Sequence, residues 1–199
     1  LSVFAKPQID YVISSERVFN SDKKSFEALD IAICGKTICD IGQRFKYRSL
    51  DVNYIDYGTK VISPGFIDPH THSLSELKNE KTSANLNYLT QGVTTVINGN
   101  DGKSPLSIAK TTKQLLSHGI GTNVAFFIGH NTVRNAVMGK EDRQPSTREM
   151  NKMKALVERN MQAGALGLST GLYYLPGTFA TTEEVVTLAK VAANYQGIY

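Results

Sequence analysis

A repeated strand–loop–helix pattern that begins near Val61 constrains the fold of this chain more than any other feature. Short apolar runs alternate with longer segments that have helical periodicity. The expected strands are residues 61–67, 94–98, 124–128 and 165–169, and the expected helices are residues 75–91, 105–118, 147–163 and 182–194. A glycine follows each helical segment, where a left-handed residue ends a helix at low cost. This alternation predicts a parallel sheet with helices outside it.

The starts of the expected helices carry recognisable capping signals. Ser104 precedes Pro105, which places a capping residue before a proline at the first helical position. Two later helices begin with a serine or threonine followed three residues on by glutamate, the pattern of a capping box. These pairs are Ser146 with Glu149 and Thr181 with Glu184.

The same alternation is found in doubly wound sheets and in barrels. The sequence contains neither G-x-G-x-x-G nor a P-loop, the motifs of nucleotide-binding doubly wound folds, so it does not support that kind of fold. A complete barrel needs about 250 residues, and the part after residue 60 is long enough for about four βα units. Residues 197–199 have the character of a fifth strand beginning. We therefore expect this sequence to be the front part of a longer protein.

Residues 1–60 have a different texture and predict a small all-β segment. Short strands are expected at residues 11–13, 31–33 and 37–41. Within this segment, Gly35-Lys36 predicts a hairpin turn between Cys34 and Cys39. A two-residue turn pairs Cys34 with Thr37 and brings no simple disulfide, so we expect two free thiols, with a wider loop as the alternative. The cysteine count does not fix the cellular compartment.

The composition excludes some classes of protein. Hydrophobic residues make up 41% and charged residues 20%, which is ordinary for a globular chain, and no apolar run approaches the ~20 residues of a membrane span. The net charge is +4, but basic residues form no dense run with stacking aromatics, so no nucleic-acid partner is expected. Val3-Phe4-Ala5 has the spacing of a signal-peptidase site or is an ordinary terminus, which leaves periplasmic or secreted and cytoplasmic locations open.

The strongest chemical signal is the His-x-His pair at His70 and His72. In an extended chain, residues two apart point to the same side, so both imidazoles can face one metal ion. Imidazole binds zinc and its neighbours well. Pro69 lacks a backbone donor and predicts that the strand ends here, where α/β proteins place their sites. The alternative is two solvated histidines.

The residues around this pair resemble a known family. The run Pro64 to His72 resembles the first barrel strand of the metal-dependent amidohydrolase superfamily. The resemblance continues through residues 91–96, 127–131 and 137–139. The run 164–174, with Pro176-Gly177, is similar to the N-acyl-D-amino-acid deacylases, or D-aminoacylases. The resemblance implies a small β-sandwich segment (1–60) followed by the first half of a TIM-type (β/α)8 barrel (61–199).

The resemblance also implies a third metal ligand. Asp101 stands at a position that resembles a zinc-ligating cysteine of the D-aminoacylases. A carboxylate can replace a thiolate as an anionic ligand, although it is harder and shifts the preferred metal. The alternative is that Asp101-Gly102 is only a turn. No lysine lies between Gly164 and Thr182 to bridge two metals, as it does in many amidohydrolases, so Asp101 is the candidate bridge.

Other polar residues near the expected strand ends are candidates for substrate contact. His130 ends the third strand, and Tyr173 with Tyr174 follows the fourth, where the rings can line an acyl pocket. Arg134 either meets a substrate carboxylate or forms a loop-fixing salt bridge, and the salt bridge is favoured. Asp68 is expected to orient the histidines without binding metal itself.

The function implied by the resemblance is metal-dependent hydrolysis of a linear amide, with an N-acyl-D-amino acid as the small-molecule substrate and zinc as the expected divalent metal. The family's catalytic aspartate and two further histidine ligands would lie beyond Tyr199, so the catalytic residues are unknown and the fragment alone is expected to be inactive. One alternative is a cyclic amidase of the dihydropyrimidinase or dihydroorotase type, which the absent lysine disfavours. The other is a non-catalytic homologue. The acyl group, the side chain, the stereospecificity and the oligomeric state stay open.

Overall fold

The structure is a computed structural model that describes residues 8–199, so Val3-Phe4-Ala5 lies outside the described residues. The chain divides into two units, Leu1–Pro64 and Gly65–Tyr199. No helix within residues 8–199 is long and apolar enough to cross a membrane.

The first unit contains a mixed β-sheet. Its strands are β1 (Tyr11–Asn20), β2 (Ser25–Cys34), β3 (Thr37–Gln43), β4 (Asn53–Asp56) and β5 (Val61–Ile62). The order is β3-β2-β1-β4, and β5 also pairs with β1. Neighbours among β1, β2 and β3 run antiparallel, whereas β4 and β5 run parallel to β1. Residues 8–64 thus form one sheet, and a second sheet of the expected sandwich is not found among them.

The expected hairpin is present, but the expectation of two free thiols is wrong. Cys34 pairs with Thr37 and Ile33 with Ile38, as a two-residue turn requires. The register then shifts, so that Ala32 faces Asp40 and Cys39 is the extra residue of a β-bulge. The bulge brings the two cysteine Cα atoms to 5.7 Å, and the thiols form a disulfide. A one-residue irregularity of this kind has no signature in the local sequence.

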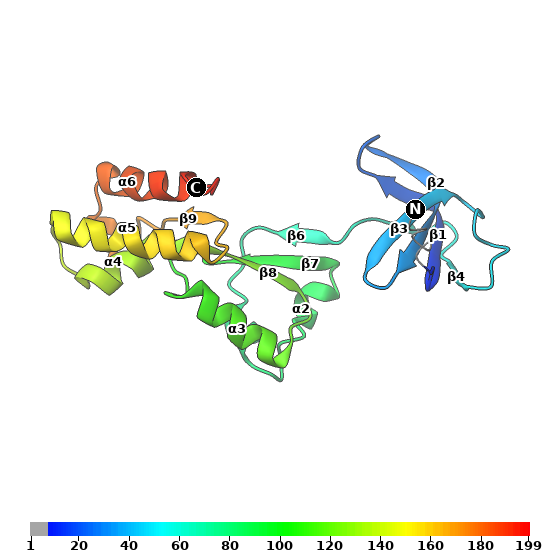
Figure 1. Ribbon diagram of the computed structural model, residues 1–199, viewed down its shortest axis with the longest axis horizontal. Coiled ribbons are helices and arrows are strands. Elements are labelled where there is room, and N and C mark those ends of the chain that lie inside the picture. Colours follow the sequence, from blue (N-terminus) through cyan, green and yellow to red (C-terminus); the bar gives the residue numbers. More distant parts are fainter. Residues whose placement is uncertain (1–7) are drawn as a thin grey trace, which may run out of the picture. The chain divides into compact units, whose positions relative to one another are not determined.

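The second unit is built on a parallel sheet in the order β6-β7-β8-β9, which confirms the predicted parallel arrangement (Figure 1). The strands are β6 (Phe66–Asp68), β7 (Val93–Asn98), β8 (Asn123–Gly129) and β9 (Gly167–Ser169). Ile198 adds a single parallel bridge beside Gly167, as expected for the start of a fifth strand. The prediction of a single strand at residues 61–67 is wrong. This segment contains two short strands, of which β5 belongs to the first sheet and β6 to the second.

Helices cover this sheet. They are α1 (Leu74–Lys78), α2 (Leu86–Leu89), α3 (Ile108–His118), α4 (His130–Met138), α5 (Thr147–Gln162) and α6 (Thr182–Ala193), with a 3-10 turn η1 (Gly177–Phe179). Helices α5 and α6 lie side by side (Figure 1). The apolar faces of the helices in this unit pack on the strands and form one core. Its fully buried members include Leu77, Val96, Leu115, Ile128, Val133, Met153, Leu168 and Leu188.

Two of the expected helices are corrected. The helix at 75–91 is wrong as one element, because α1 ends at Lys78, where Asn79 is extended, and α2 begins only after Asn85, whose backbone is left-handed (φ 52°). The buried amide of Asn85 donates to the Thr122 hydroxyl at 3.0 Å, a distant contact that supports this conformation. Helix α3 begins after Ser107, whose side chain caps it, and not at Pro105.

The capping signals are confirmed in one helix and in half of another. Ser146 and Glu149 make both bonds of the capping box at the start of α5. At α6, the Thr181 hydroxyl accepts from the Glu184 backbone, but the Glu184 carboxylate binds elsewhere. Helix α4 was missed, since its short apolar face gives little signal.

Candidate metal centre

The three expected metal ligands come together at one edge of the parallel sheet. His70 and His72 follow β6, and Asp101 follows the neighbouring β7, so the carboxyl ends of two adjacent strands carry them. The Asp101 Oδ2 atom lies 3.4 Å from His70 Nε2 and 3.3 Å from His72 Nε2. One ligand atom from each side chain lies within 4.8 Å of the others. The parity argument for the histidines is consistent with this convergence.

These separations suit a shared metal ion. Ligands at 2.0–2.1 Å from a tetrahedral zinc ion are about 3.3 Å from one another. The side chains are partly open, with 58% of His70, 66% of His72 and 37% of Asp101 exposed. Two imidazoles and one carboxylate are also the donor types that zinc accepts. The set therefore has the chemistry and spacing to hold one ion and leaves room for further ligands.

The turn that presents Asp101 depends on glycine. Asp101 itself has φ 54°, in the left-handed region that aspartate tolerates better than most residues. Gly99 and Gly102 on either side have φ 88° and 70°. A Cβ atom on Gly99 would lie 2.2 Å from the Phe127 carbonyl oxygen, so the turn packs directly on β8. Asp101 can therefore belong to a turn and also be a metal ligand.

Asp68 supports the histidine pair through the main chain. Its Oδ1 atom accepts a hydrogen bond from the His70 backbone N–H at 3.1 Å. This contact agrees with the expectation that Asp68 orients the pair. Its carboxylate is not one of the three converging donors.

A shallow pocket of about 270 Å³ lies beside the candidate ligands. It is lined by His70, Asn100, Asp101, Phe127, Leu168, Ser169, Thr170 and Tyr199. Metal donors, a hydroxyl-bearing strand end and apolar walls meet here, as in a small-molecule site.

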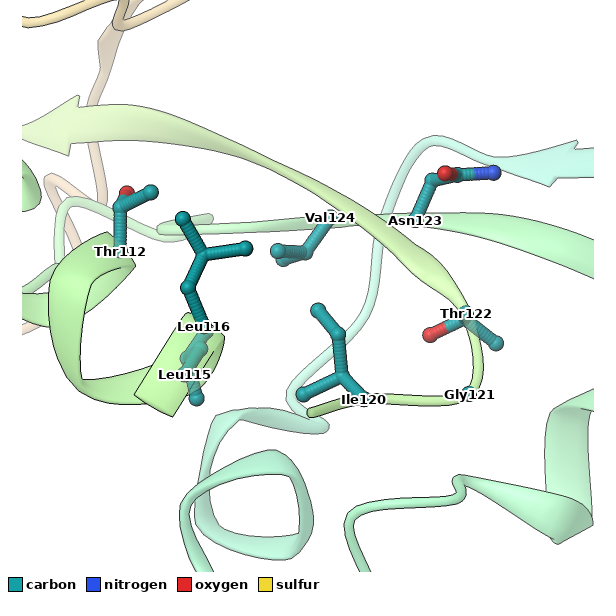
Figure 2. Close-up of a pocket in the computed structure, with 8 residues that line it drawn as sticks. All are labelled: Thr112, Leu115, Leu116, Ile120, Gly121, Thr122, Asn123 and Val124. Atoms are coloured by element: carbon teal, nitrogen blue, oxygen red, sulfur yellow. The ribbon is translucent and has the colours of Figure 1, made fainter. Parts of the chain in front are cut away.

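A second cavity, of about 310 Å³, has a different character (Figure 2). Asn123 and Val124 at its wall begin β8, so it lies at the opposite end of the strands from Asp101. Its other lining residues are Thr112, Leu115, Leu116, Ile120, Gly121 and Thr122. No ionisable side chain is among them, so we assign it no part in the chemistry.

His130 is placed inside the fold. It has no exposed surface, and its Nε2 atom lies 2.8 Å from Glu184 Oε1. Arg134, also fully buried, donates from Nη1 to Glu184 Oε2 and from Nη2 to two loop carbonyls, which confirms the favoured salt-bridge reading. Burial alone raises the pKa of Glu184, but hydrogen bonds from His130 and Arg134 outweigh it and lower that pKa. The sequence marked Glu184 only as a capping residue.

The two tyrosines lie on the loop after β9. Their ring centroids are 5.5 Å apart, and 91% of Tyr173 and 43% of Tyr174 is exposed. The amide of Asn131 donates to the carbonyl oxygens of Gly171 and Tyr174 and fixes this loop. Neither tyrosine nor His130 lines the pocket at Asp101, so their substrate roles stay predictions.

Comparison with known proteins agrees with these features. Residues 54–197 match the amidohydrolase family. A D-aminoacylase of Alcaligenes xylosoxydans xylosoxydans is 34% identical over 96% of this chain and 43% of the relative. An N-acyl-D-aspartate deacylase of the same organism is 30% identical over 94% of this chain and 41% of the relative.

Solved structures are similar as well. One is an N-acyl-D-glutamate deacylase from Bordetella bronchiseptica, complexed with zinc and a phosphonate inhibitor. It superposes with a TM-score of 0.86 at 26% identity, and the match covers 96% of this chain and 44% of the deacylase chain. A crystal structure of D-aminoacylase has a TM-score of 0.84 at 29% identity, with the same coverage. This chain spans less than half the length of these relatives. On its sequence match and its fold, the chain belongs to the amidohydrolase family and is related to the D-aminoacylases.

Proposed function

We propose that the whole protein hydrolyses the amide bond of N-acyl-D-amino acids with a divalent metal, zinc in the first instance, held in part by His70, His72 and Asp101. The observation that carries this proposal is the convergence of the three donor atoms within 4.8 Å. The 34% identity to a D-aminoacylase supports the substrate class.

The chain's residues have distinct parts in this proposal. A bound divalent ion lowers the pKa of a water molecule and polarises a carbonyl group. His70 and His72 would offer imidazole nitrogen donors, and the Asp101 carboxylate would offset part of the ion's charge. The apolar walls from Phe127 and Leu168 give the acyl group a dry surface beside these donors. The catalytic base and the remaining ligands are proposed to lie after Tyr199.

We also propose that the first unit, Leu1–Pro64, is one part of a β-sandwich and that the second, Gly65–Tyr199, is the first four βα units of a barrel. Apolar residues from β1, β2 and β3 line an open hollow of about 480 Å³ on the first sheet. Phe19, Ile38 and Ile41 there are 36%, 57% and 53% exposed. Such a surface favours cover by a second layer.

The test is a double substitution, His70→Asn with His72→Asn, in the full-length protein. Bound zinc and hydrolysis of N-acetyl-D-amino acids should both fall, because two of the proposed ligands are lost. His118→Asn is the matched control, since His118 contacts the Leu77 carbonyl oxygen at 2.9 Å and is not one of the converging donors.

Other results would redirect the proposal. Unchanged metal content and rate in the double variant would contradict the metal site. Hydrolysis of cyclic but not linear amides would favour the cyclic amidase, and a wild-type protein with less than one bound metal would favour a non-catalytic homologue.

A further inference from the structure

We propose that Asn100 is a positioning residue that fixes the His70–His72 segment against the turn carrying Asp101, and that Ser169 fixes the same turn from its other side. The inference rests on the proposed metal site and names the residues that hold that site in shape. Neither residue offers a ligand atom to the converging set.

Asn100 connects the two ligand-bearing segments directly. Its side chain is 6% exposed, and its Nδ2 atom donates to the carbonyl oxygens of Thr71 at 3.3 Å and Ile97 at 2.9 Å. Thr71 lies between the two histidines in the sequence, and Asn100 immediately precedes Asp101. One buried amide therefore sets the distance between the histidine segment and the aspartate turn.

Thr71 strengthens this connection. Its backbone N–H and its hydroxyl both donate to the Ile97 carbonyl oxygen, at 2.9 and 3.0 Å. The same oxygen accepts the Asn100 amide. The end of β7 is thus the common anchor of the histidine segment and of the aspartate turn.

Ser169 closes the turn from the end of β9. Its hydroxyl accepts from the Gly102 backbone N–H at 3.2 Å and donates to the Gly99 carbonyl oxygen. Gly99 and Gly102 are the two ends of the turn that carries Asp101. A Cβ atom on Gly171 would lie 2.2 Å from the Asp101 carbonyl oxygen, so the chain after Ser169 packs directly on the turn.

The exposed ligands need this support. More than half of each histidine side chain is exposed, so surrounding side chains do little to hold the imidazoles in place. The ligand geometry is therefore set by the backbone of the histidine segment and of the turn that carries Asp101. Groups that orient ligands typically change metal affinity 10–100-fold when they are removed. Loss of the Asn100 amide should release the histidine segment from the turn and weaken metal binding by about that factor.

The experiment measures the zinc dissociation constant, by competition with a chromophoric chelator, in the full-length protein. Asn100→Ala and Ser169→Ala should each raise it by about 10-fold or more. Asn160→Ala is the matched control: Asn160 is 1% exposed and its amide also donates to two carbonyl oxygens, those of Leu106 and Leu156. It should lower the melting temperature and leave zinc affinity unchanged.

The outcomes separate this inference from the proposed function. Zinc affinity at the wild-type value in either Asn100→Ala or Ser169→Ala overturns the positioning role assigned to that residue. If Asn100→Ala does not fold, Asn100→Ser decides for Asn100, because serine keeps a polar side chain but is too short to join the Thr71 carbonyl oxygen, and wild-type zinc affinity in it overturns the role of Asn100. A zinc affinity that survives loss of both histidines refutes the metal site itself, whereas loss of zinc there with no effect of Asn100→Ala or Ser169→Ala refutes only the positioning. An equal loss in Asn160→Ala also overturns it, because general destabilisation then accounts for the change.

Discussion

Asp101 combines a backbone requirement with a candidate ligand. The left-handed φ of 54° favours a short polar residue, and the carboxylate lies 3.3–3.4 Å from both imidazoles. Substitutions can separate the two demands. Asparagine tolerates the same backbone conformation but has no charge. Cysteine replaces the carboxylate with a thiolate, which is also an anionic ligand. Alanine removes both the ligand and the preference for a left-handed turn.

We expect Asp101→Asn and Asp101→Ala in the full-length protein to lose most bound metal and amide hydrolysis, by about 10-fold or more. Asp101→Cys should keep metal and favour zinc over harder ions, because thiolate is the softer ligand. Metal analysis and N-acetyl-D-amino-acid hydrolysis measure both effects. Wild-type metal and rate in Asp101→Ala would show that Asp101 is only a turn residue.

Glu184 is a buried carboxylate that His130 and Arg134 both contact. Glu184→Gln leaves Arg134 without its charged partner, and breaking a buried pair from one side costs about 3–5 kcal/mol. Urea denaturation measures this loss in the free energy of unfolding. Glu183→Gln is the matched control, because Glu183 is the exposed neighbour on α6. A loss no larger than that of the control would contradict the structural role of the pair.

The same residue predicts a pH dependence. The pKa of Glu184 is lowered in the fold from 4.5. Between the lowered and the ordinary value, the unfolded chain binds more protons, so stability rises with pH. The contribution is complete above about pH 4.5 and is lost as the pH falls through the lowered pKa. In Glu184→Gln, the free energy of unfolding should fall less steeply than in the wild type as the pH drops below about 4.5.

Helix α5 has the most complete local start signal. The Ser146 hydroxyl accepts from the Glu149 backbone N–H, and the Glu149 carboxylate accepts from the Ser146 backbone N–H. Ser146→Ala removes one half of this box and should cost about 1 kcal/mol in the free energy of unfolding. Ser117→Ala, on the exposed face of α3, is the control and should stay within about 0.5 kcal/mol. Equal effects in urea denaturation would argue against the cap.

At the level of the whole molecule, both ends of the parallel sheet expose apolar side chains. Phe66 and Ile67 of the edge strand β6 are 61% and 64% exposed, and Ile198 and Tyr199 are 59% and 68% exposed. Expressed alone, residues 1–199 should associate and bind a hydrophobic dye, because unpaired edges and open apolar surface favour aggregation. Size-exclusion chromatography and dye fluorescence measure this. A monomer with cooperative unfolding and amidase activity would contradict the prediction.

The alternation of strand-like and helical runs in the sequence was enough to predict the parallel sheet of the second unit, and the Ser146–Glu149 spacing was enough to predict the start of α5. The strand and helix patterns and the cap themselves depend on residues only two to four positions apart, where backbone geometry repeats regularly. The expectation that Asp101 is a ligand came from the family resemblance, and the parallel pairing of β6 with β7 places it near the histidines.

Only the tertiary structure decided the features that join distant residues. The bulge that pairs Cys34 with Cys39, the left-handed Asn85 beside Thr122, and the Glu184 carboxylate between His130 and Arg134 have no local signature. The disulfide depends on a one-residue bulge within its own hairpin, whereas Asn85 and Glu184 each bond a residue 37 or more positions away, and for Glu184 that contact replaced a capping bond. Local energies of about 1 kcal/mol decide a residue's conformation only where packing and buried polar groups do not demand another.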